Sequence, residues 1–336
     1  MIGDRMSSAY AASTDWQEKI APDEQQRFEG YARQFTEIQK RKSARWGVGR
    51  ALHRKQVTAA FGTLEVLDGI PAFARHGLFA GPHIYEVWVR LSNGGLDRAP
   101  DARPDVRGFS IRVLGVTGDS ALGNGPAKSQ DFTLINHEAF SFAGSGEFVE
   151  FVVAASQGGG AIIKHVVKRY GLLGGPKLLG KMVKFAKKPF SGFATEPLFS
   201  AVPMANGPYA VRVRLVPGAS NGEAVHGAAR NWSADFCGRL AQGPLHWDLQ
   251  LQYFANESVT PIEDASVNWP TPYTTVARLM LPRQDAASPQ GWALSQEVEG
   301  TVIDPWQALA EHRPLGEVQR ARKVVYFASQ KGRGAA

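Results

Sequence analysis

Apolar and polar residues alternate along several stretches of this 336-residue chain, as they do in half-buried β-strands. The clearest alternation runs from Ile84 to Ser92. Similar runs, bounded by Gly, Pro or Asp, lie on both sides of it along the chain. The pattern predicts seven strands, at 61–67, 84–92, 107–114, 130–136, 209–216, 247–254 and 273–281.

Elsewhere the apolar residues recur at helical spacing. From residue 15 to about residue 43, they return every three or four positions among charged residues, which predicts an exposed helix lying on a larger body. Residues 1–14 are predicted to be disordered. Further helices are predicted at 146–156, across a basic segment at 161–193, at 228–241 and, as one or two helices, between 305 and about 329.

The predicted strands are clustered, and the helices lie between or after them without regular βαβ spacing. This order predicts an α+β fold with a mainly antiparallel sheet. Because so many strands alternate, we expect the sheet to close as a barrel. The length suffices for a large hydrophobic core, so we expect one domain over residues 15–336.

Composition excludes several classes of protein. Cys237 is the single cysteine, so neither an intramolecular disulfide nor a cysteine-based zinc or iron–sulfur site is expected. The first residues contain no apolar signal-peptide region, and no run of about eighteen apolar residues occurs. We therefore expect a cytoplasmic protein without a membrane span.

The net charge of +7 is concentrated in one segment. No acidic residue lies between Glu150 and Glu196, whereas eight Lys and Arg residues do, so the remainder of the chain is close to neutral. This distribution does not indicate nucleic-acid binding. The segment 161–193 interleaves its lysines with apolar residues, which suggests a surface for anionic lipid or lipid hydroperoxide. The alternative is a core-packed amphipathic helix with a solvated lysine face.

Tyr326 lies on a predicted helix, one turn after Arg322 and on the same face. A guanidinium beside a phenol stabilises the negative charge of the phenolate. A tyrosinate is one of the proximal ligands that haem proteins use. The alternative is a tyrosine that packs a terminal helix beside a surface arginine.

Five stretches resemble, in order, motifs of the catalase superfamily, and particularly of its small, catalase-related haem peroxidase branch. The resemblance spans residues 45–327 and implies a catalase-like barrel. The matching stretches are 50–66 (the distal motif), 89–92 (the Arg-Phe-Ser strand), 104–113 (the Arg-Gly-Phe motif), 264–270 (the Trp-Pro motif) and 322–326 (the Arg and Tyr of the proximal helix).

The resemblance implies a haem b enzyme that acts on hydrogen peroxide or organic (lipid) hydroperoxides. A neutral imidazole above the iron can move a proton between the two peroxide oxygens. The implied roles are distal base for His53, support of that base for Ser92, proximal iron ligand for Tyr326, ionisation of that ligand for Arg322, and propionate binding for Arg50 and Arg107.

The sequence departs from the catalase pattern in two places. Ser129 or Gln130 falls where catalases have a distal asparagine, so fast dismutation of hydrogen peroxide is not expected. The sequence ends ten residues after Tyr326, so we expect the C-terminal helical region of full catalases to be absent and the haem pocket to be more open.

Two other functions stay open. One is a catalase-fold protein that binds haem or lipid without redox turnover. The other is rearrangement of hydroperoxides, as in allene oxide synthases, although Leu52 stands where those relatives tend to have a hydroxyl residue. Since catalases are commonly oligomers, the resemblance also allows a homo-oligomer.

Overall fold

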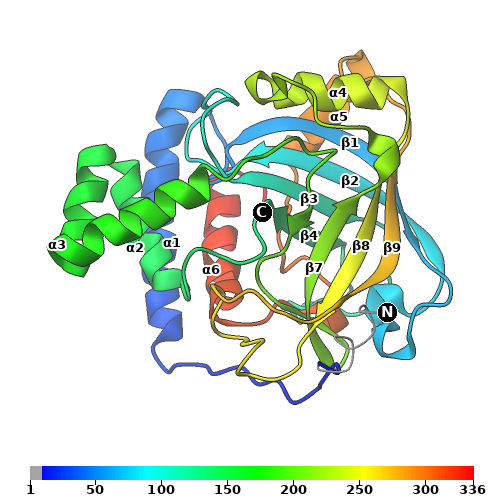
Figure 1. Ribbon diagram of the computed structural model, residues 1–336, viewed down its shortest axis with the longest axis horizontal. Coiled ribbons are helices and arrows are strands. Elements are labelled where there is room, and N and C mark those ends of the chain that lie inside the picture. Colours follow the sequence, from blue (N-terminus) through cyan, green and yellow to red (C-terminus); the bar gives the residue numbers. More distant parts are fainter. Residues whose placement is uncertain (1–9) are drawn as a thin grey trace, which may run out of the picture.

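Eight strands close into an antiparallel barrel in the computed structural model, which describes residues 10–336 (Figure 1). The ring closes where β5 pairs with both β4 and β7, while β6 pairs with the start of β7. The strands are β1 (Lys55–Val66), β2 (His83–Asn93), β3 (Arg107–Val113), β4 (Gln130–Ile135), β5 (Leu198–Phe199), β6 (Met204–Asn206), β7 (Tyr209–Pro217), β8 (Leu245–Tyr253) and β9 (Tyr273–Leu281).

The barrel interior is the main hydrophobic core. Alternate residues of β2, namely Val87, Val89 and Leu91, are almost fully buried in it, and Phe109 of β3 meets Trp247 of β8 edge to face at 5.5 Å between ring centroids. Burying one such large side chain stabilises the fold by about 1.5–3 kcal/mol. The residues that alternate with them on β2, such as Arg90 and Ser92, belong to the opposite face of the strand.

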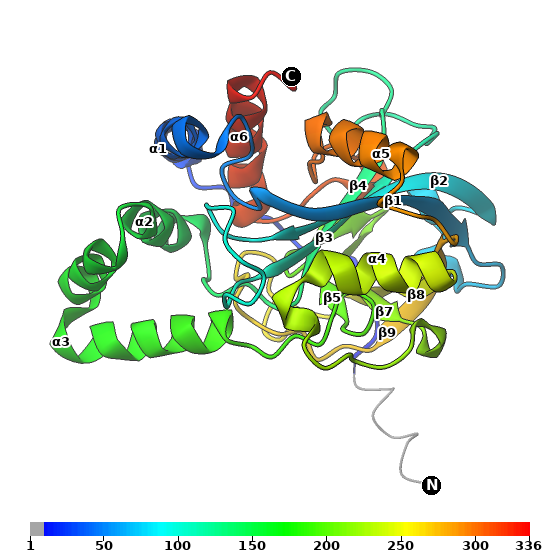
Figure 2. The ribbon, with the colours of Figure 1, turned by 90° about the horizontal axis from the view of Figure 1, so that it is seen from above.

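Six α-helices flank the barrel in the described part of the chain. Helices α1 and α6 pack against each other, α4 and α5 contact β1, and α2 and α3 extend to one side (Figure 2). The helices are α1 (Glu24–Trp46), α2 (Ser145–Ser156), α3 (Gly159–Ala186), α4 (Trp232–Gln242), α5 (Pro289–Gly300) and α6 (Glu317–Gly332).

The structure confirms the α+β fold, the closed barrel and all seven predicted strands. It adds β5 and β6, which are too short to show alternation, and α5, which the sequence did not predict. Val298 is the one residue of helix α5 that is fully buried, and Trp292 is 65% exposed. The apolar periodicity of this helix is therefore weak. Residues 305–316, predicted to be helical, are mostly irregular, and α6 begins only at Glu317.

The first helix begins later than residue 15. Residues 15–20 are irregular, and α1 begins at Glu24, directly after Pro22 and Asp23. Proline disfavours helical backbone in the residue before it, so the helix cannot extend back through residue 21. The Asp23 carboxylate does not cap the helix but accepts from Arg27 Nε at 3.0 Å.

The predicted disorder of residues 1–14 stays a prediction for residues 1–9, which lie outside the described residues. Within the described part, the Ser13 N–H donates to the Phe254 carbonyl oxygen at 2.9 Å. No helix between residues 10 and 336 is long and apolar enough to cross a lipid bilayer.

Candidate functional site

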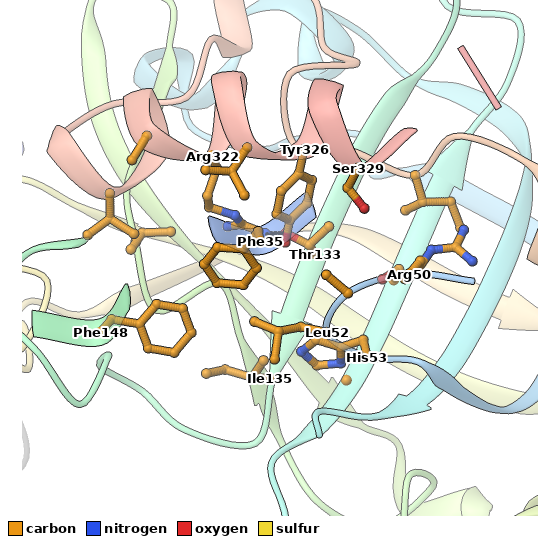
Figure 3. Close-up of a pocket in the computed structure, with 18 of the residues that line it drawn as sticks. Phe35, Arg50, Leu52, His53, Thr133, Ile135, Phe148, Arg322, Tyr326 and Ser329 are labelled. Carbon is orange, nitrogen blue, oxygen red and sulfur yellow. Dashed lines mark hydrogen bonds between the residues drawn. The ribbon is translucent and has the colours of Figure 1, made fainter. Parts of the chain in front are cut away.

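A cavity lies between the outer face of the barrel and the helices α1, α2 and α6, and Figure 3 shows part of its lining. It brings together four of the predicted site residues: Arg50, His53, Arg322 and Tyr326. Tyr326 projects into the cavity from α6, and His53 reaches it from the opposite side (Figure 3). On the side of α1 and α2, the walls are mainly aromatic or apolar and include Tyr31, Phe35, Phe140, Phe148 and Val149.

The loop that carries His53 is anchored by a buried arginine. Arg54 is fully buried, and its guanidinium donates to the Gly47 carbonyl oxygen at 3.0 Å and to Ser43 Oγ at 2.9 Å. These bonds attach the loop to the end of α1. The sequence 45–54 therefore forms a turn between the helix and β1 that delivers His53 to the cavity wall.

His53 is held at its backbone and at its ring. Its φ of 49° is uncommon for a residue other than glycine, and such strained conformations cluster at functional sites. The His53 N–H donates to the Gly94 carbonyl oxygen at 3.0 Å, and Arg90 Nη2 donates to the His53 carbonyl oxygen at 2.9 Å. Nδ1 of the ring lies 3.0 Å from Ser92 Oγ, as the sequence predicted.

The His53 ring is neutral at physiological pH. Burial, and next the nearby positive charges of Arg90, Arg322 and Arg50, together lower its pKa from 6.5 to about 3. With Nδ1–H donating to Ser92 Oγ, the lone pair of Nε2 is free to accept a proton. The site therefore contains a base that stays unprotonated well below neutral pH.

Gly108 makes room for the imidazole. It pairs with Ser92 across β2 and β3, and a Cβ at this position would lie 2.5 Å from His53 Nδ1 and 2.6 Å from Ser92 Oγ. These two atoms contact each other, and this contact sets the orientation of the His53 ring. A side chain of any size at position 108 would therefore displace His53.

We expect Gly108→Ala to lower the free energy of unfolding by about 1–3 kcal/mol, because the added Cβ would overpack against His53 and Ser92. The far-ultraviolet circular dichroism spectrum should not change, and urea unfolding measures the loss. Gly81→Ala is the matched control, since a Cβ there would meet nothing within 4 Å. Equal stability of the two variants would show that the packing at Gly108 is not close enough to hold the His53 ring in place.

Tyr326 and Arg322 lie one turn apart on α6, as predicted. Arg322 Nη2 donates to Tyr326 Oη at 2.9 Å and to Thr133 Oγ1 of β4 at 2.9 Å, and its Nη1 donates to Gln319 Oε1 at 3.0 Å. The guanidinium is thus fixed by three acceptors. A cationic donor in this position stabilises negative charge on the phenol oxygen.

One end of the cavity carries more positive than negative charge. Arg50 Nη1 lies 3.0 Å from Glu299 Oε2, and Arg90 Nη2 lies 2.8 Å from the same oxygen. Arg333 is close by, with Nη2 donating to the Thr301 carbonyl oxygen at 2.8 Å. Burial, and next the charge of Arg90, lower the pKa of Arg50. Two of these three cations pair with the single Glu299 carboxylate, and within the described part of the chain Arg333 bonds only to backbone carbonyls, which leaves this end suited to binding anionic groups.

Arg107 does not reach the cavity, contrary to the sequence-based prediction. It lies on the face of β3 opposite the cavity-lining Gly108. There it is buried, and Nη1 donates to Asn93 Oδ1 at 2.5 Å while Nη2 donates to the Asp101 carbonyl oxygen at 2.8 Å. Its guanidinium also lies 5.7 Å from the ring centroid of Trp232. Because these contacts fix the loop, Arg107 has a structural role here.

The sequence missed Arg90 and Arg333 as cavity residues. A charged residue inside an apolar strand was the feature that could have indicated Arg90. In the structure, Arg90 is only 2% exposed. The two candidates for the catalase asparagine, Ser129 and Gln130, are not among the residues that line the cavity. Ser129 Oγ donates to Asp131 Oδ1 at 2.7 Å, and Gln130 Oε1 accepts from the Leu309 N–H at 3.0 Å.

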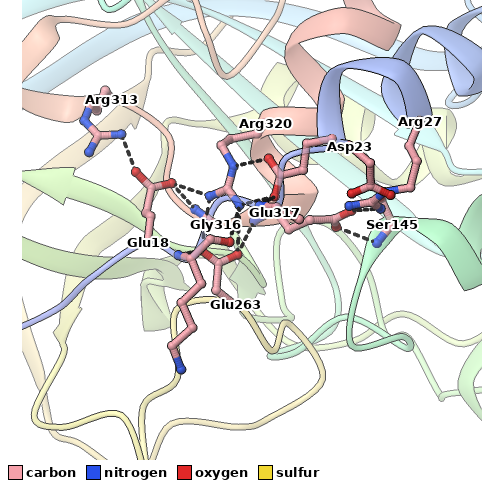
Figure 4. A network of polar contacts seen from close by, with 12 residues as sticks. Glu18, Asp23, Arg27, Ser145, Glu263, Arg313, Gly316, Glu317 and Arg320 are labelled. Atoms are coloured by element: carbon pink, nitrogen blue, oxygen red, sulfur yellow. Dashed lines mark hydrogen bonds and ion pairs between the residues drawn. The ribbon is translucent and has the colours of Figure 1, made fainter.

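A polar network holds the start of α6, the helix that carries Tyr326 (Figure 4). Arg320 Nη1 lies 2.7 Å from Glu18 Oε1, and its Nη2 lies 2.7 Å from Glu24 Oε1. Glu18 also accepts from the Gly316 N–H at 2.8 Å and from Arg313 Nη1 at 2.7 Å. The segment before α1 is thereby attached to α6 through Glu18.

We expect Glu18→Gln to lower the free energy of unfolding by about 1–2 kcal/mol at pH 7, since it weakens two charge-assisted hydrogen bonds. Burial opposes ionisation of Glu18, but donation from Gly316 and Arg313 outweighs it and lowers the pKa below 4.5. The charge therefore stabilises the folded state above pH 4.5, and this contribution is lost as the pH falls further. Urea unfolding at pH 7 and at pH 4 measures the difference.

The control is Glu257→Gln, which removes an exposed ion pair with a 3.9 Å separation from Lys19 Nζ. Such a change should cost less than about 0.5 kcal/mol. A cost for Glu18→Gln that is as small as the control, or that grows as the pH is lowered, would contradict the role given to this network.

Comparison with solved structures identifies the architecture. A fungal catalase matches with a TM-score of 0.64 and 16% identity over 85% of this chain and 59% of its own. Catalase A from Saccharomyces cerevisiae matches with a TM-score of 0.64 and 15% identity over 85% of this chain and 61% of its own. The chain has a catalase-like fold.

A bacterial catalase shares the catalase-like fold with a TM-score of 0.62 and 15% identity over 98% of this chain and 64% of its own length. The chain thus spans roughly three fifths of the length of these catalases. No protein-family model matches it, and no curated protein matches its sequence. At this identity the likeness confirms the predicted fold alone.

Proposed function

We propose that this protein is a haem-dependent peroxidase that acts on organic hydroperoxides. The observation that carries the proposal is the placement of His53 and Tyr326 in one cavity, each with its own supporting side chain. Ser92 orients the first, and Arg322 donates to the second. A ferric haem in a catalase-like fold would require an anionic oxygen ligand on one side and a neutral base on the other. Tyr326 and His53 would supply these two groups.

The residues present fit haem b. Tyr326 Oη, with Arg322 beside it, would bind the iron, and the arginine-rich end formed by Arg50, Arg90 and Arg333 would hold the two propionates. The remaining walls are largely apolar, as a porphyrin face requires. When bound, the haem supplies a redox-active iron for the reductive cleavage of a peroxide O–O bond.

His53 would move one proton within the bound peroxide. Nε2 accepts the proton of the inner oxygen and returns it to the departing oxygen, so that an alcohol leaves. Overall, one hydroperoxide, two electrons and two protons give one alcohol and one water. The electrons would come from a one-electron donor such as a phenol. Ser92 keeps the proton on Nδ1, which leaves Nε2 as the base.

The lining of the cavity favours organic hydroperoxides over hydrogen peroxide. Leu52 and Ile135 flank His53 (Figure 3). Among the described residues that line the cavity, Gln330 of α6 carries the one amide side chain. Gln330 donates to Asp304 Oδ2 at 2.6 Å and is thereby committed elsewhere. The aromatic wall formed by Phe140 and Phe148 offers apolar surface for an alkyl chain.

Peroxide turnover by the haem-loaded protein should be nearly constant from pH 7 down to pH 5. A histidine with a pKa of 6.5 would be mostly protonated at pH 5, whereas His53, with its pKa of about 3, stays neutral. Initial rates with an organic hydroperoxide over this range, checked against haem content at each pH, give the profile. A rate that falls tenfold per pH unit below pH 6.5 would contradict the neutral base.

The function itself is tested by comparing cumene hydroperoxide with hydrogen peroxide, using the haem-loaded protein and a phenolic donor. We expect a higher kcat/KM for the organic peroxide and stoichiometric formation of its alcohol. Rearranged products from a fatty acid hydroperoxide without donor oxidation would instead indicate an isomerase. Bound haem without turnover of any peroxide would indicate a binding protein.

A further inference from the structure

Helices α2 and α3 form an arm, residues 145–188, that projects from the barrel (Figure 2). The two segments of α3 meet at Gly171, whose φ of 73° breaks the helix. The second segment returns to the barrel, where Phe185 stacks on His137 with ring centroids 3.5 Å apart. The arm therefore presents a long outer surface that the barrel does not cover.

The arm carries a dense group of exposed cations. Arg169 pairs with Glu150 at 3.5 Å, and Lys188 Nζ donates to the Asn136 carbonyl oxygen at 2.6 Å. The other six have neither an ion pair nor a side-chain hydrogen bond within residues 10–336. These are Lys164, Lys168, Lys177, Lys181, Lys184 and Lys187, all of them exposed.

Large apolar side chains are exposed beside these lysines. Leu173 is 93% exposed just after the break at Gly171, and Ile163 and Val183 are 56% and 44% exposed. A helix face that only contacts solvent gains no stability from exposed apolar side chains. Their presence on the same element is typical of a surface that contacts a partner or a membrane.

Helical geometry places both kinds of side chain on one face. Lys177, Lys181 and Lys184 follow each other at spacings of four and three residues. Leu173, four residues before Lys177, lies on the same stripe, whereas Val183 lies about 100° around the helix from Lys184. Met182, only 8% exposed, marks the opposite, packed face of the segment. The outer face of the second segment is therefore a lysine stripe that begins with the exposed Leu173.

We propose that this arm docks on the surface of an anionic phospholipid bilayer. The lysines would lie at the level of the headgroup phosphates, and Leu173 would enter the acyl boundary, as in interfacial helices. An acidic protein or a nucleic acid would use the lysines but leave Leu173 without a role. Because α2 also contributes Phe148 to the cavity wall, docking would bring the cavity beside the bilayer.

Vesicle flotation of the full-length protein tests the proposal independently of haem chemistry. We expect binding to phosphatidylcholine vesicles that contain phosphatidylglycerol, and none to phosphatidylcholine alone. Lys177→Glu/Lys181→Glu/Lys184→Glu should weaken binding by about a hundredfold or more, since each cation near an anionic surface contributes about fivefold. Leu173→Asn should weaken it several-fold with the charge unchanged.

The matched control reverses three exposed cations that are not on the arm: Lys128, Arg230 and Arg283. This variant has the same net charge as the arm variant and should bind like the wild type. Circular dichroism and haem content verify that each variant is folded. Three results would overturn the proposal: no wild-type binding to anionic vesicles at low salt, equal binding by the arm and control variants, or full binding by Leu173→Asn. The last result would indicate a purely electrostatic polyanion site.

Discussion

Replacing His53 with asparagine is expected to slow peroxide turnover of the haem-loaded protein by about 10²–10⁴-fold, the contribution of a positioned general base. Asparagine tolerates the positive φ of 49° found at this position, so the loop should keep its conformation. It cannot accept and return a proton near neutral pH. Haem content should therefore stay unchanged, and stopped-flow mixing with an organic hydroperoxide should show the loss in the first chemical step.

His137 provides the matched control for this variant. Burial lowers its pKa to about 4, so it is also a buried neutral histidine, but it stacks on Phe185 at the base of α3 and does not line the cavity. His137→Asn should leave the turnover of the loaded protein within about twofold of the wild type. Retention of the wild-type rate by His53→Asn would remove His53 from the mechanism.

Replacing Tyr326 with phenylalanine is expected to weaken haem binding by more than the roughly 10–100-fold that loss of a supporting group costs a metal site. Phenylalanine fills nearly the same volume but has no oxygen to bind iron. Arg322 would also lose one of its three acceptors. Titration of the apoprotein with haem gives the affinity, and the ferric absorption spectrum should shift because the anionic ligand is missing.

Tyr31 offers a control on the far wall of the same cavity, since it is carried by α1 and not by α6. Tyr31→Phe removes a phenol of the same kind and should leave the ferric spectrum unchanged. An unaltered spectrum in Tyr326→Phe, or a shift of equal size in Tyr31→Phe, would refute the assignment of Tyr326 as the iron ligand.

The barrel could be predicted because each long strand buries one face. That burial forces the alternation seen from Val87 to Leu91. Helix α5 and the strands β5 and β6 leave weaker traces, since α5 buries a single residue and the two strands have two and three residues. Periodicity cannot detect elements that bury so little surface or extend over so few positions.

At the site, the sequence located residues whose roles depend on local spacing. Arg322 and Tyr326 are one helical turn apart, and this spacing alone brings their side chains together. The arginine prediction was partly wrong because Arg107 lies on the core-facing side of β3, whereas Gly108 and Ser110 of the same strand face the cavity. Arg107 turns into the 94–106 loop, whereas Arg90 points toward Glu299 and the cavity. The alternation along each strand assigns Arg90 and Arg107 to opposite faces of the sheet, but the prediction for Arg107 came from the family resemblance and not from this alternation.

The most direct test of the account is an absorption spectrum of the purified protein, ferric and then reduced with dithionite, with the haem extracted as its pyridine complex. The account predicts one haem b per chain and a ferric spectrum typical of tyrosinate ligation. Failure to bind haem even after reconstitution of the folded protein would contradict it, and the cavity would then have to serve another ligand.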